Sequence, residues 1–237
     1  MDHPVAVIGG TGRTGRLIVR DLLSHGEQVR VLSRRSPGPR SLPPGAEHHP
    51  TDVRLAESLR RPLHGCSALV YCVEPGTDNE GRDRPETTMS QGVRHVLAAA
   101  TAAGERPHVV LVSQIHATHS AHPLNAYGRL MDWRYAGEEA VRTSGLPYTV
   151  VRPGWLTDEP AGSQGVILSQ GDTQTGVVAR GDLAQACLQA LYCPAARGLT
   201  FELFNRSGGP LQPAETRTPA WDHAFAALDY DPALTAA

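Results

Sequence analysis

The sequence predicts an α/β protein with a doubly wound parallel sheet, helices on both faces and a small C-terminal segment. Short apolar segments alternate along the chain with longer segments of helical periodicity, as strands and crossover helices do in a parallel sheet. The length of 237 residues suits one full-sized domain. Hydrophobic residues make up 40% of the chain and charged residues 19%, so a disordered protein is excluded.

The alternation assigns the elements in order along the chain. Apolar runs bounded by turn-forming residues predict strands at residues 5–8, 28–32, 46–49 (the weakest), 68–73, 108–112, 148–151 and 200–204. Helices are predicted at residues 14–24, 55–63, 85–103, 127–144 and 182–192, with a short one at about 221–228. Gly26, Gly104 and Gly145 stand where three of these helices need a C-terminal stop.

Two segments interrupt the alternation. Residues 74–84 are polar and follow a strand that should end at the ligand-binding edge of the sheet, and residues 153–176 are rich in Pro, Gly, Ser and Thr. We expect both to be loops near a site. The chain is thus predicted to be a single domain over 1–237, with its core at about 4–156 and substrate-side loops and a C-terminal segment at about 157–237.

Composition excludes several classes of function. Lysine is absent and all 22 basic residues are arginines, which excludes a Schiff base, a P-loop lysine and a tyrosine–lysine pair. A net charge of −2 gives no reason to expect nucleic acid or an anionic membrane as partner. The apolar runs are too short to cross a bilayer, and residues 1–4 lack the basic and apolar parts of a secretion signal, so we expect none. The four cysteines lack CxxC spacing, so we expect thiols in a reducing cytoplasm.

The strongest motif is the glycine-rich loop after the first predicted strand. Gly10-x-Gly12-x-x-Gly15, or the shifted Gly9-x-x-Gly12-x-x-Gly15, follows a strand and opens a helix. One glycine makes the tight turn, one lets the backbone approach a pyrophosphate, and one permits close helix–strand packing. The phosphates then lie on the helix N-terminus.

This context predicts a Rossmann-type dinucleotide site; an ordinary glycine-rich turn is the competing interpretation. The loop residues assigned to it are Gly9, Thr11, Gly12, Arg13, Thr14 and Gly15.

The end of the second predicted strand favours NADP(H). An NAD site needs a carboxylate there to bind the ribose hydroxyls, but the strand ends in Ser33, Arg34 and Arg35. Together with Arg13, these arginines suit a guanidinium clamp for a 2′-phosphate, to which Ser33 adds a hydroxyl. Solvated surface arginines are the competing interpretation.

The chain resembles the atypical short-chain dehydrogenases/reductases, specifically their NAD(P)H-binding, NmrA-like group. The resemblance spans roughly residues 4–205, and its most specific part is Ser-Gly-Leu-Pro-Tyr-Thr-Val-Val-Arg-Pro-Gly at 144–154. The other motifs that carry it are residues 9–15, Thr51-Asp52-Val53, Val110-Leu111-Val112-Ser113 and Arg180-Gly181-Asp182-Leu183-Ala184.

The resemblance implies further contacts with the cofactor. Asp52 and Val53 would lie against the adenine, although Asp52 alone could equally be a turn or helix N-cap residue. Cys72 and Val73 would line the cofactor. The segment Pro153, Gly154 and Trp155 would run beside the nicotinamide.

The expected catalytic residues are only partly present. Members that reduce carbonyls have a serine after the fifth strand, which Ser113 matches, and a tyrosine and a lysine four residues apart on the next helix. Alignment places Leu130 in the tyrosine position and Arg134 in the lysine position. Arg134 can still donate to ribose hydroxyls but cannot titrate near neutrality. Tyr127, about one helical turn earlier, is the nearest substitute for the acid, with packing at the helix start as the alternative.

A histidine-rich loop offers another proton donor. The loop holds His116, His119 and His122, and since a histidine side chain can donate a proton near pH 7, we name His116 as the candidate. No carboxylate accompanies them, so we predict no metal site. Glu138 and Glu139 on the following helix are expected to form a solvated face.

Together these features predict an NADPH-dependent reductase, a ketoreductase or quinone-type enzyme. Its expected substrate is a small hydrophobic or aromatic carbonyl compound, and its expected context is secondary-metabolite (polyketide) biosynthesis. The alternatives are a non-catalytic NADP(H)-sensing regulator of the NmrA type and, ranked last, an epimerase or dehydratase. We expect a small-molecule substrate, no nucleic-acid or membrane partner, and a monomer or homodimer.

Overall fold

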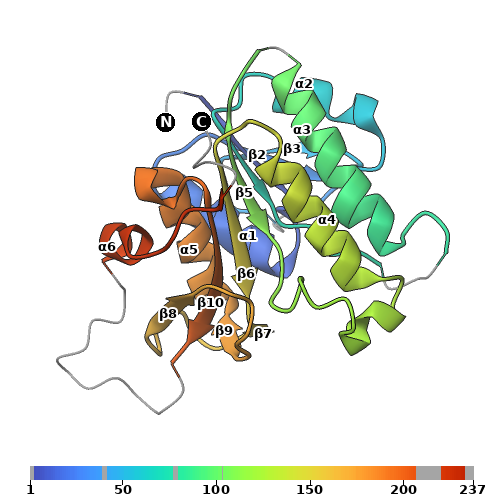
Figure 1. Ribbon diagram of the computed structural model, residues 1–237. Coiled ribbons are helices and arrows are strands. Elements are labelled where there is room, and N and C mark those ends of the chain that lie inside the picture. The colour runs from blue at the N-terminus through green and yellow to red at the C-terminus, as the bar shows by residue number, and fades with distance from the viewer. Residues whose placement is uncertain (1–2, 39–41, 77–79, 103, 207–219, 233–237) are drawn as a thin grey trace.

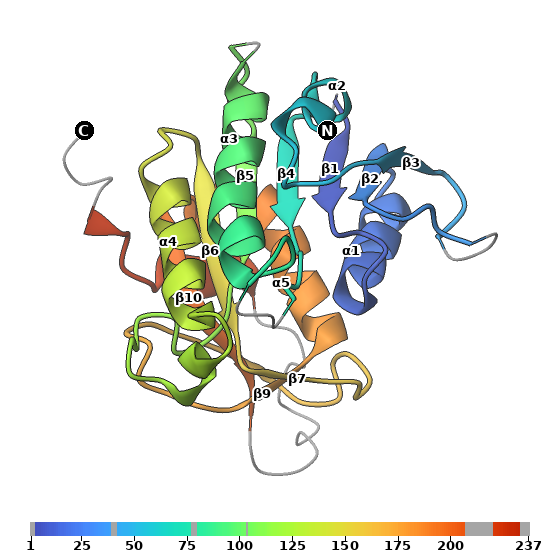
Figure 2. The same cartoon turned by 90° about the vertical axis from the view of Figure 1, so that its right-hand side faces the viewer.

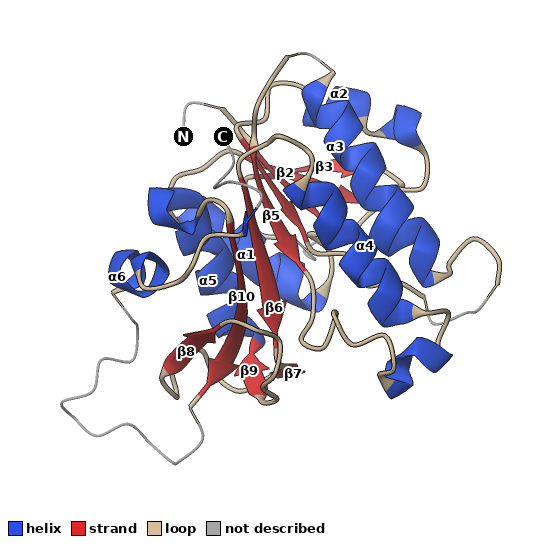
Figure 3. Ribbon diagram, viewed as in Figure 1, coloured by secondary structure: helices blue, strands red, loops and turns tan. Residues whose placement is uncertain are grey.

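The predicted fold class is confirmed by the computed structural model, which describes residues 3–38, 42–76, 80–102, 104–206 and 220–232. Its eight-stranded sheet has the order β3-β2-β1-β4-β5-β6-β10-β8 and is parallel except for β8, which pairs antiparallel with β10 (Figure 3). Its strands are β1 (Val5–Ile8), β2 (Val29–Ser33), β3 (Ala46–Pro50), β4 (Ala68–Tyr71), β5 (His108–Val112), β6 (Tyr148–Pro153), β8 (Val166–Ser169) and β10 (Leu199–Asn205). A two-stranded sheet pairs β7 (Trp155–Thr157) with β9 (Val177–Ala179).

Helices cover both faces of the large sheet (Figures 1 and 2). One face carries α1 (Arg13–Ser24), α5 (Arg180–Tyr192) and α6 (Trp221–Ala226). The other carries α2 (Arg60–Leu63), a π-helical segment (Glu86–Gly92) that continues into α3 (Val93–Thr101), and α4 (Leu130–Arg142). Single 3-10 turns lie at Ala56–Ser58, Pro123–Ala126 and Pro194–Ala196. No helix among the described residues is long and apolar enough to cross a membrane.

The central strands β1 and β4 are apolar and fully buried, because helices cover both faces of the sheet there. In β1, Val5 and Val7 pack with α1 and α5, whereas Ala6 and Ile8 pack with the helices of the opposite face. The other central strands divide their side chains in the same way. The two cores fix the parallel strands so that their carboxyl ends lie along the same edge of the sheet.

Three of the predicted helices begin later or are divided in the structure. The helix predicted at 127–144 begins at Leu130, because Arg129 has a positive φ of 57° and Gly128 of 60°. The helix predicted at 85–103 opens with the π-helical segment, where the Thr88 carbonyl accepts a 2.6 Å hydrogen bond from the Tyr71 hydroxyl. Residue 103 lies outside the described residues. The helix predicted at 55–63 divides into a 3-10 turn and α2.

The prediction that residues 153–176 form a loop is wrong in part, because this segment contains β7 and β8. The chain beyond residue 156 also contributes to the core, which was predicted to end there. Both β10 and α5 pack into the main hydrophobic core, and β8 extends the sheet. Residues 207–219 and 233–237 of the expected C-terminal segment lie outside the described residues.

We expect His108 to make folding stability depend on pH. It is buried at the start of β5, with Nε2 3.0 Å from the Thr149 hydroxyl, and burial lowers its pKa to about 4. Neutral His108 therefore contributes its full stabilisation above pH 6.5 and loses it as the pH falls towards 4. We expect His108 to account for a loss of about 2–3 kcal/mol between pH 7.5 and 4.5.

Urea unfolding of the wild type and His108→Gln at these two pH values measures this contribution. Glutamine keeps a polar group at the position without a titrating ring, and the difference between the proteins cancels every other titrating group. An identical pH dependence in both proteins would contradict the assignment.

Candidate functional site

A cavity of about 720 Å³ lies at the carboxyl ends of the strands, where the strand order reverses between β1 and β4. This is where open α/β sheets bind ligands, because two adjacent connections leave the edge in opposite directions. Six strands contribute the residues at or just after their ends: Gly9, Gly12 and Gly15 after β1; Ser33, Arg34 and Arg35 at β2; Asp52, Val53 and Arg54 after β3; Cys72, Val73 and Glu74 after β4; Ser113 and Gln114 after β5; and Pro153, Gly154 and Trp155 at β6.

The glycine loop is packed too tightly for side chains. Gly9 has φ +85°, and a Cβ placed on it would lie 2.2 Å from the Cys72 carbonyl oxygen. A Cβ on Gly15 would lie 2.3 Å from the Gly9 carbonyl oxygen. The loop leads directly into α1, whose N-terminus has no side-chain cap. The amides of this first turn therefore suit a pyrophosphate, and the loop fits the predicted dinucleotide.

The ends of β2 and β3 bring together arginines that are far apart in the sequence. Arg34 and Arg35 line the cavity, and so does Arg54, which the sequence analysis missed. Arg54 binds both carboxylate oxygens of Asp52, at 2.8 Å from Nε and 2.6 Å from Nη2, and this hydrogen bonding lowers the pKa of Asp52. Its position in the sequence, two residues after Asp52, could have indicated that Arg54 lies at the same site. Ser33 donates to the Arg35 carbonyl at 2.9 Å.

The opposite end of the cavity is less charged. Cys72 lies there as a thiol, because burial raises its pKa to about 12. Trp155, 44% exposed, forms part of the wall with Pro153 and Gly154. This end can therefore hold an apolar or aromatic group.

Arg134 and Gln114 supply hydrogen-bond donors to this end. Arg134 is 5% exposed, and its Nη2 donates to Glu74 at 2.8 Å. Its Nε and the Gln114 Nε2 are buried without a hydrogen-bond partner in the described part of the chain. Buried N–H groups are almost always paired in proteins. These two donors are therefore candidates for holding an acceptor on a ligand.

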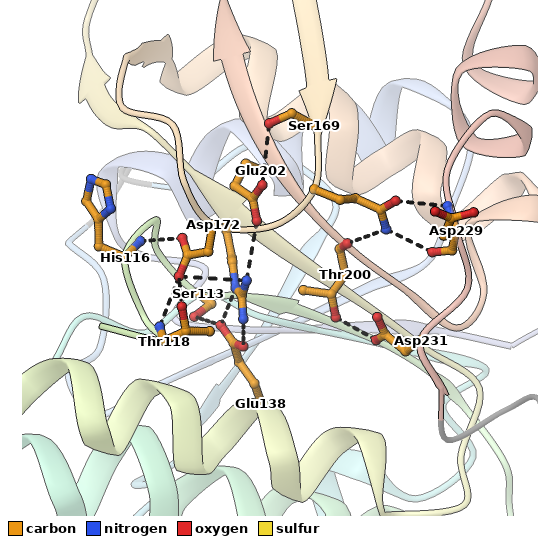
Figure 4. A network of polar contacts seen from close by, with 12 residues as sticks. Ser113, His116, Thr118, Glu138, Ser169, Asp172, Thr200, Glu202, Asp229 and Asp231 are labelled. Atoms are coloured by element: carbon orange, nitrogen blue, oxygen red, sulfur yellow. Dashed lines mark hydrogen bonds and ion pairs between the residues drawn. The ribbon is translucent and has the colours of Figure 1, made fainter. Parts of the chain in front are cut away.

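The Ser113 hydroxyl belongs to a buried charge network (Figure 4). Ser113 Oγ donates to Glu138 Oε1 at 2.5 Å, and Arg152 donates to both oxygens of Glu138, at 3.0 Å and 2.6 Å. Because its proton points at Glu138, Ser113 presents acceptor lone pairs to the cavity. The expectation that Glu138 lies on a solvated face is wrong: it is fully buried, since it compensates Arg152 on β6.

The other two predicted catalytic residues do not line this cavity. Tyr127 precedes α4 instead of lying on it, and it is 51% exposed. The His116 amide donates to Asp172 at 2.5 Å, and its ring stacks on those of His119 and His122 at 5.2 Å between centroids. No group of three potential ligands able to hold a metal ion occurs among the described residues. Every residue predicted to bind the cofactor does line the cavity, and the binding roles stay predictions: Gly9, Thr11, Gly12, Arg13, Thr14, Gly15, Ser33, Arg34, Arg35, Asp52, Val53, Cys72, Val73, Arg134, Pro153, Gly154 and Trp155.

By its fold and its cavity, this chain is a dinucleotide-binding protein of the Rossmann type. The chain belongs to the NAD(P)H-binding family, whose model matches residues 9–194. This match confirms the resemblance on which the sequence analysis relied.

Three known proteins illustrate the relationship. An uncharacterised chloroplastic protein of Arabidopsis thaliana is 29% identical over 235 residues, spanning 89% of this chain and 72% of that protein. Sanguinarine reductase of Eschscholzia californica is 24% identical over 246 residues, spanning 86% and 90%. The solved structure of an anaerobilin reductase from Escherichia coli O157:H7 superposes with a TM-score of 0.72 at 18% identity, covering 88% of this chain and all of that one.

Proposed function

We propose that the protein is an NADPH-dependent reductase of a small hydrophobic or aromatic carbonyl compound. The observation that carries the proposal is the set of arginines at the adenosine end of the cavity: Arg34, Arg35 and Arg54 gather where an NAD site needs a carboxylate. Two of the relatives are named as reductases, which agrees with this chemistry. Because all four cysteines are free thiols, we place the reaction in a reducing compartment such as the cytoplasm.

Arg134 and Gln114 are the residues we assign to the reacting end. When bound, NADPH supplies a hydride to the carbonyl carbon. The unpaired Arg134 Nε and Gln114 Nε2 stabilise the negative charge that develops on the oxygen. Arg134 stays charged throughout, so the proton that completes the alcohol comes from water or from a phenol beside the carbonyl. Ser113 accepts a hydrogen bond from such a phenol, because its own proton is held by Glu138.

A second candidate is an NADP(H)-sensing regulator without turnover. It is favoured by Leu130, a buried apolar side chain in the position where the resembled reductases have their tyrosine. Both functions require the same cofactor site, so turnover separates them.

Fluorescence titration with NADPH and NADH, followed by a panel of quinones and aryl ketones, tests the proposal. We expect NADPH to bind about 10- to 100-fold more tightly than NADH, the value of one charge-assisted phosphate contact. Oxidation of bound NADPH by a member of the panel supports the reductase. Binding without oxidation supports the sensor, and no binding of either nucleotide contradicts both functions.

A further inference from the structure

A carboxylate occupies the position between two arginines of the cavity. Asp83 Oδ1 accepts from Arg34 Nη1 at 2.8 Å and also pairs with Arg54 Nη1. All three residues line the cavity at the ends of β2 and β3. One oxygen between two guanidinium groups is also the arrangement in which arginines hold a phosphate oxygen.

The position of Asp83 on the surface shows that this contact is replaceable. The Asp83 side chain is 51% exposed and that of Arg34 is 50% exposed. Asp52, the other partner of Arg54, is only 18% exposed and binds it through both oxygens. The Arg34–Asp83 pair is exposed at both ends, whereas the Arg54 side chain is 16% exposed, and exposed pairs contribute little to stability. An incoming anion can therefore displace Asp83 while Asp52 keeps Arg54 in place.

A second carboxylate has the same relation to the glycine loop. Asp158 accepts from Arg180 Nη1 at 2.7 Å and pairs with Arg13, the first residue of α1. Its side chain is 63% exposed, and both arginines line the cavity. Arg13 lies at the helix N-terminus where a pyrophosphate is expected.

We propose that Asp83 limits the preference for NADPH over NADH, by occupying the 2′-phosphate position on Arg34 and Arg54. Asp158 likewise occupies the pyrophosphate position on Arg13. The proposal rests on the proposed cofactor site. A 2′-phosphate must break the two contacts of Asp83 and approach a like charge, and NADH carries no group that does so. Both dinucleotides carry the pyrophosphate, so Asp158 opposes both equally.

Titration of the full-length protein with NADPH and with NADH, for the wild type, Asp83→Asn and Asp158→Asn, tests the proposal. Asp83→Asn should lower the Kd for NADPH about fivefold, the factor expected from one exposed ion pair, and leave that for NADH within about twofold. Asp158→Asn should lower both Kd values by a similar factor.

Glu86→Gln is the matched control for net charge. Glu86 lies three residues from Asp83 and pairs with Arg84 at 2.8 Å, and neither residue of this pair lines the cavity. It should leave both Kd values within about twofold of the wild type.

The outcomes separate this inference from the proposed function. Weaker binding of NADPH to Asp83→Asn would show that Asp83 positions the arginines and would overturn the inference, as would an equal change for both dinucleotides. A wild type that prefers NADH, with a gain for NADPH in Asp83→Asn, would overturn the proposed cofactor preference and support the role of Asp83. If NADPH binds preferentially and Asp83→Asn changes nothing, the inference fails and the proposed function stands.

Discussion

Replacing Gly15 with alanine is expected to weaken NADPH binding by about 10- to 100-fold, the cost of one or two lost charge-assisted hydrogen bonds. The added Cβ would lie 2.3 Å from the Gly9 carbonyl oxygen and 2.8 Å from the Gly10 Cα. Both are backbone atoms, so no side-chain rotation relieves the contact. The loop must move away from α1, and its amides then no longer converge on the pyrophosphate.

The same substitution should affect folding much less than binding. Alanine favours a helix over glycine by about 1 kcal/mol, which offsets part of the strain within α1. Titration with NADPH, combined with urea unfolding of the same protein, separates the two effects.

Gly38→Ala is the control for this experiment, because among the described residues other than its chain neighbours no atom lies within 4 Å of the position that its Cβ would take. Wild-type affinity in Gly15→Ala would mean that the loop does not hold a dinucleotide.

The parts of the site that could be predicted are those whose residues lie close together in the sequence. The glycine loop is local: its spacing, the strand before it and the helix after it lie within residues 5–24, and all are present in the structure. The wrong placement of Tyr127 on the helix also has a local cause. Gly128 directly follows Tyr127 and adopts a positive φ, so the helix starts after it.

The interactions that were missed join residues from different elements. Two adjacent glutamates on an amphipathic helix are typical of a solvated surface, and nothing near Glu138 in the sequence indicates otherwise. Its partners Ser113 and Arg152 come from β5 and β6, so the need for a buried carboxylate exists only once these strands are side by side. The Asp83 contacts with Arg34 and Arg54 likewise depend on the pairing of β2 with β3.

Replacing Glu138 with alanine is expected to lower the free energy of unfolding by about 3–5 kcal/mol, the cost of removing one partner from a buried ion pair. Glu138 is fully buried and accepts from Arg152 at 2.6 Å and Arg142 at 2.9 Å. Arg152 is itself 5% exposed, and its other carboxylate contacts are longer, 3.3 Å to Glu202 and 3.8 Å to Asp172. Without Glu138, a desolvated guanidinium loses its closest compensating charge. Chemical denaturation at neutral pH measures the loss.

Glu139→Ala is the control, because it changes the next residue of the same helix. Glu139 also pairs with Arg142, at 2.6 Å, but its side chain is 45% exposed. Its removal should therefore change the free energy of unfolding by no more than about 1 kcal/mol. Equal losses in the two variants would mean that helix propensity or the shared contact with Arg142 dominates, and that Glu138 does not act by compensating Arg152. A large loss confined to Glu138→Ala would instead show that the wall behind Ser113 is held by buried charge, which keeps the Ser113 proton directed away from the cavity.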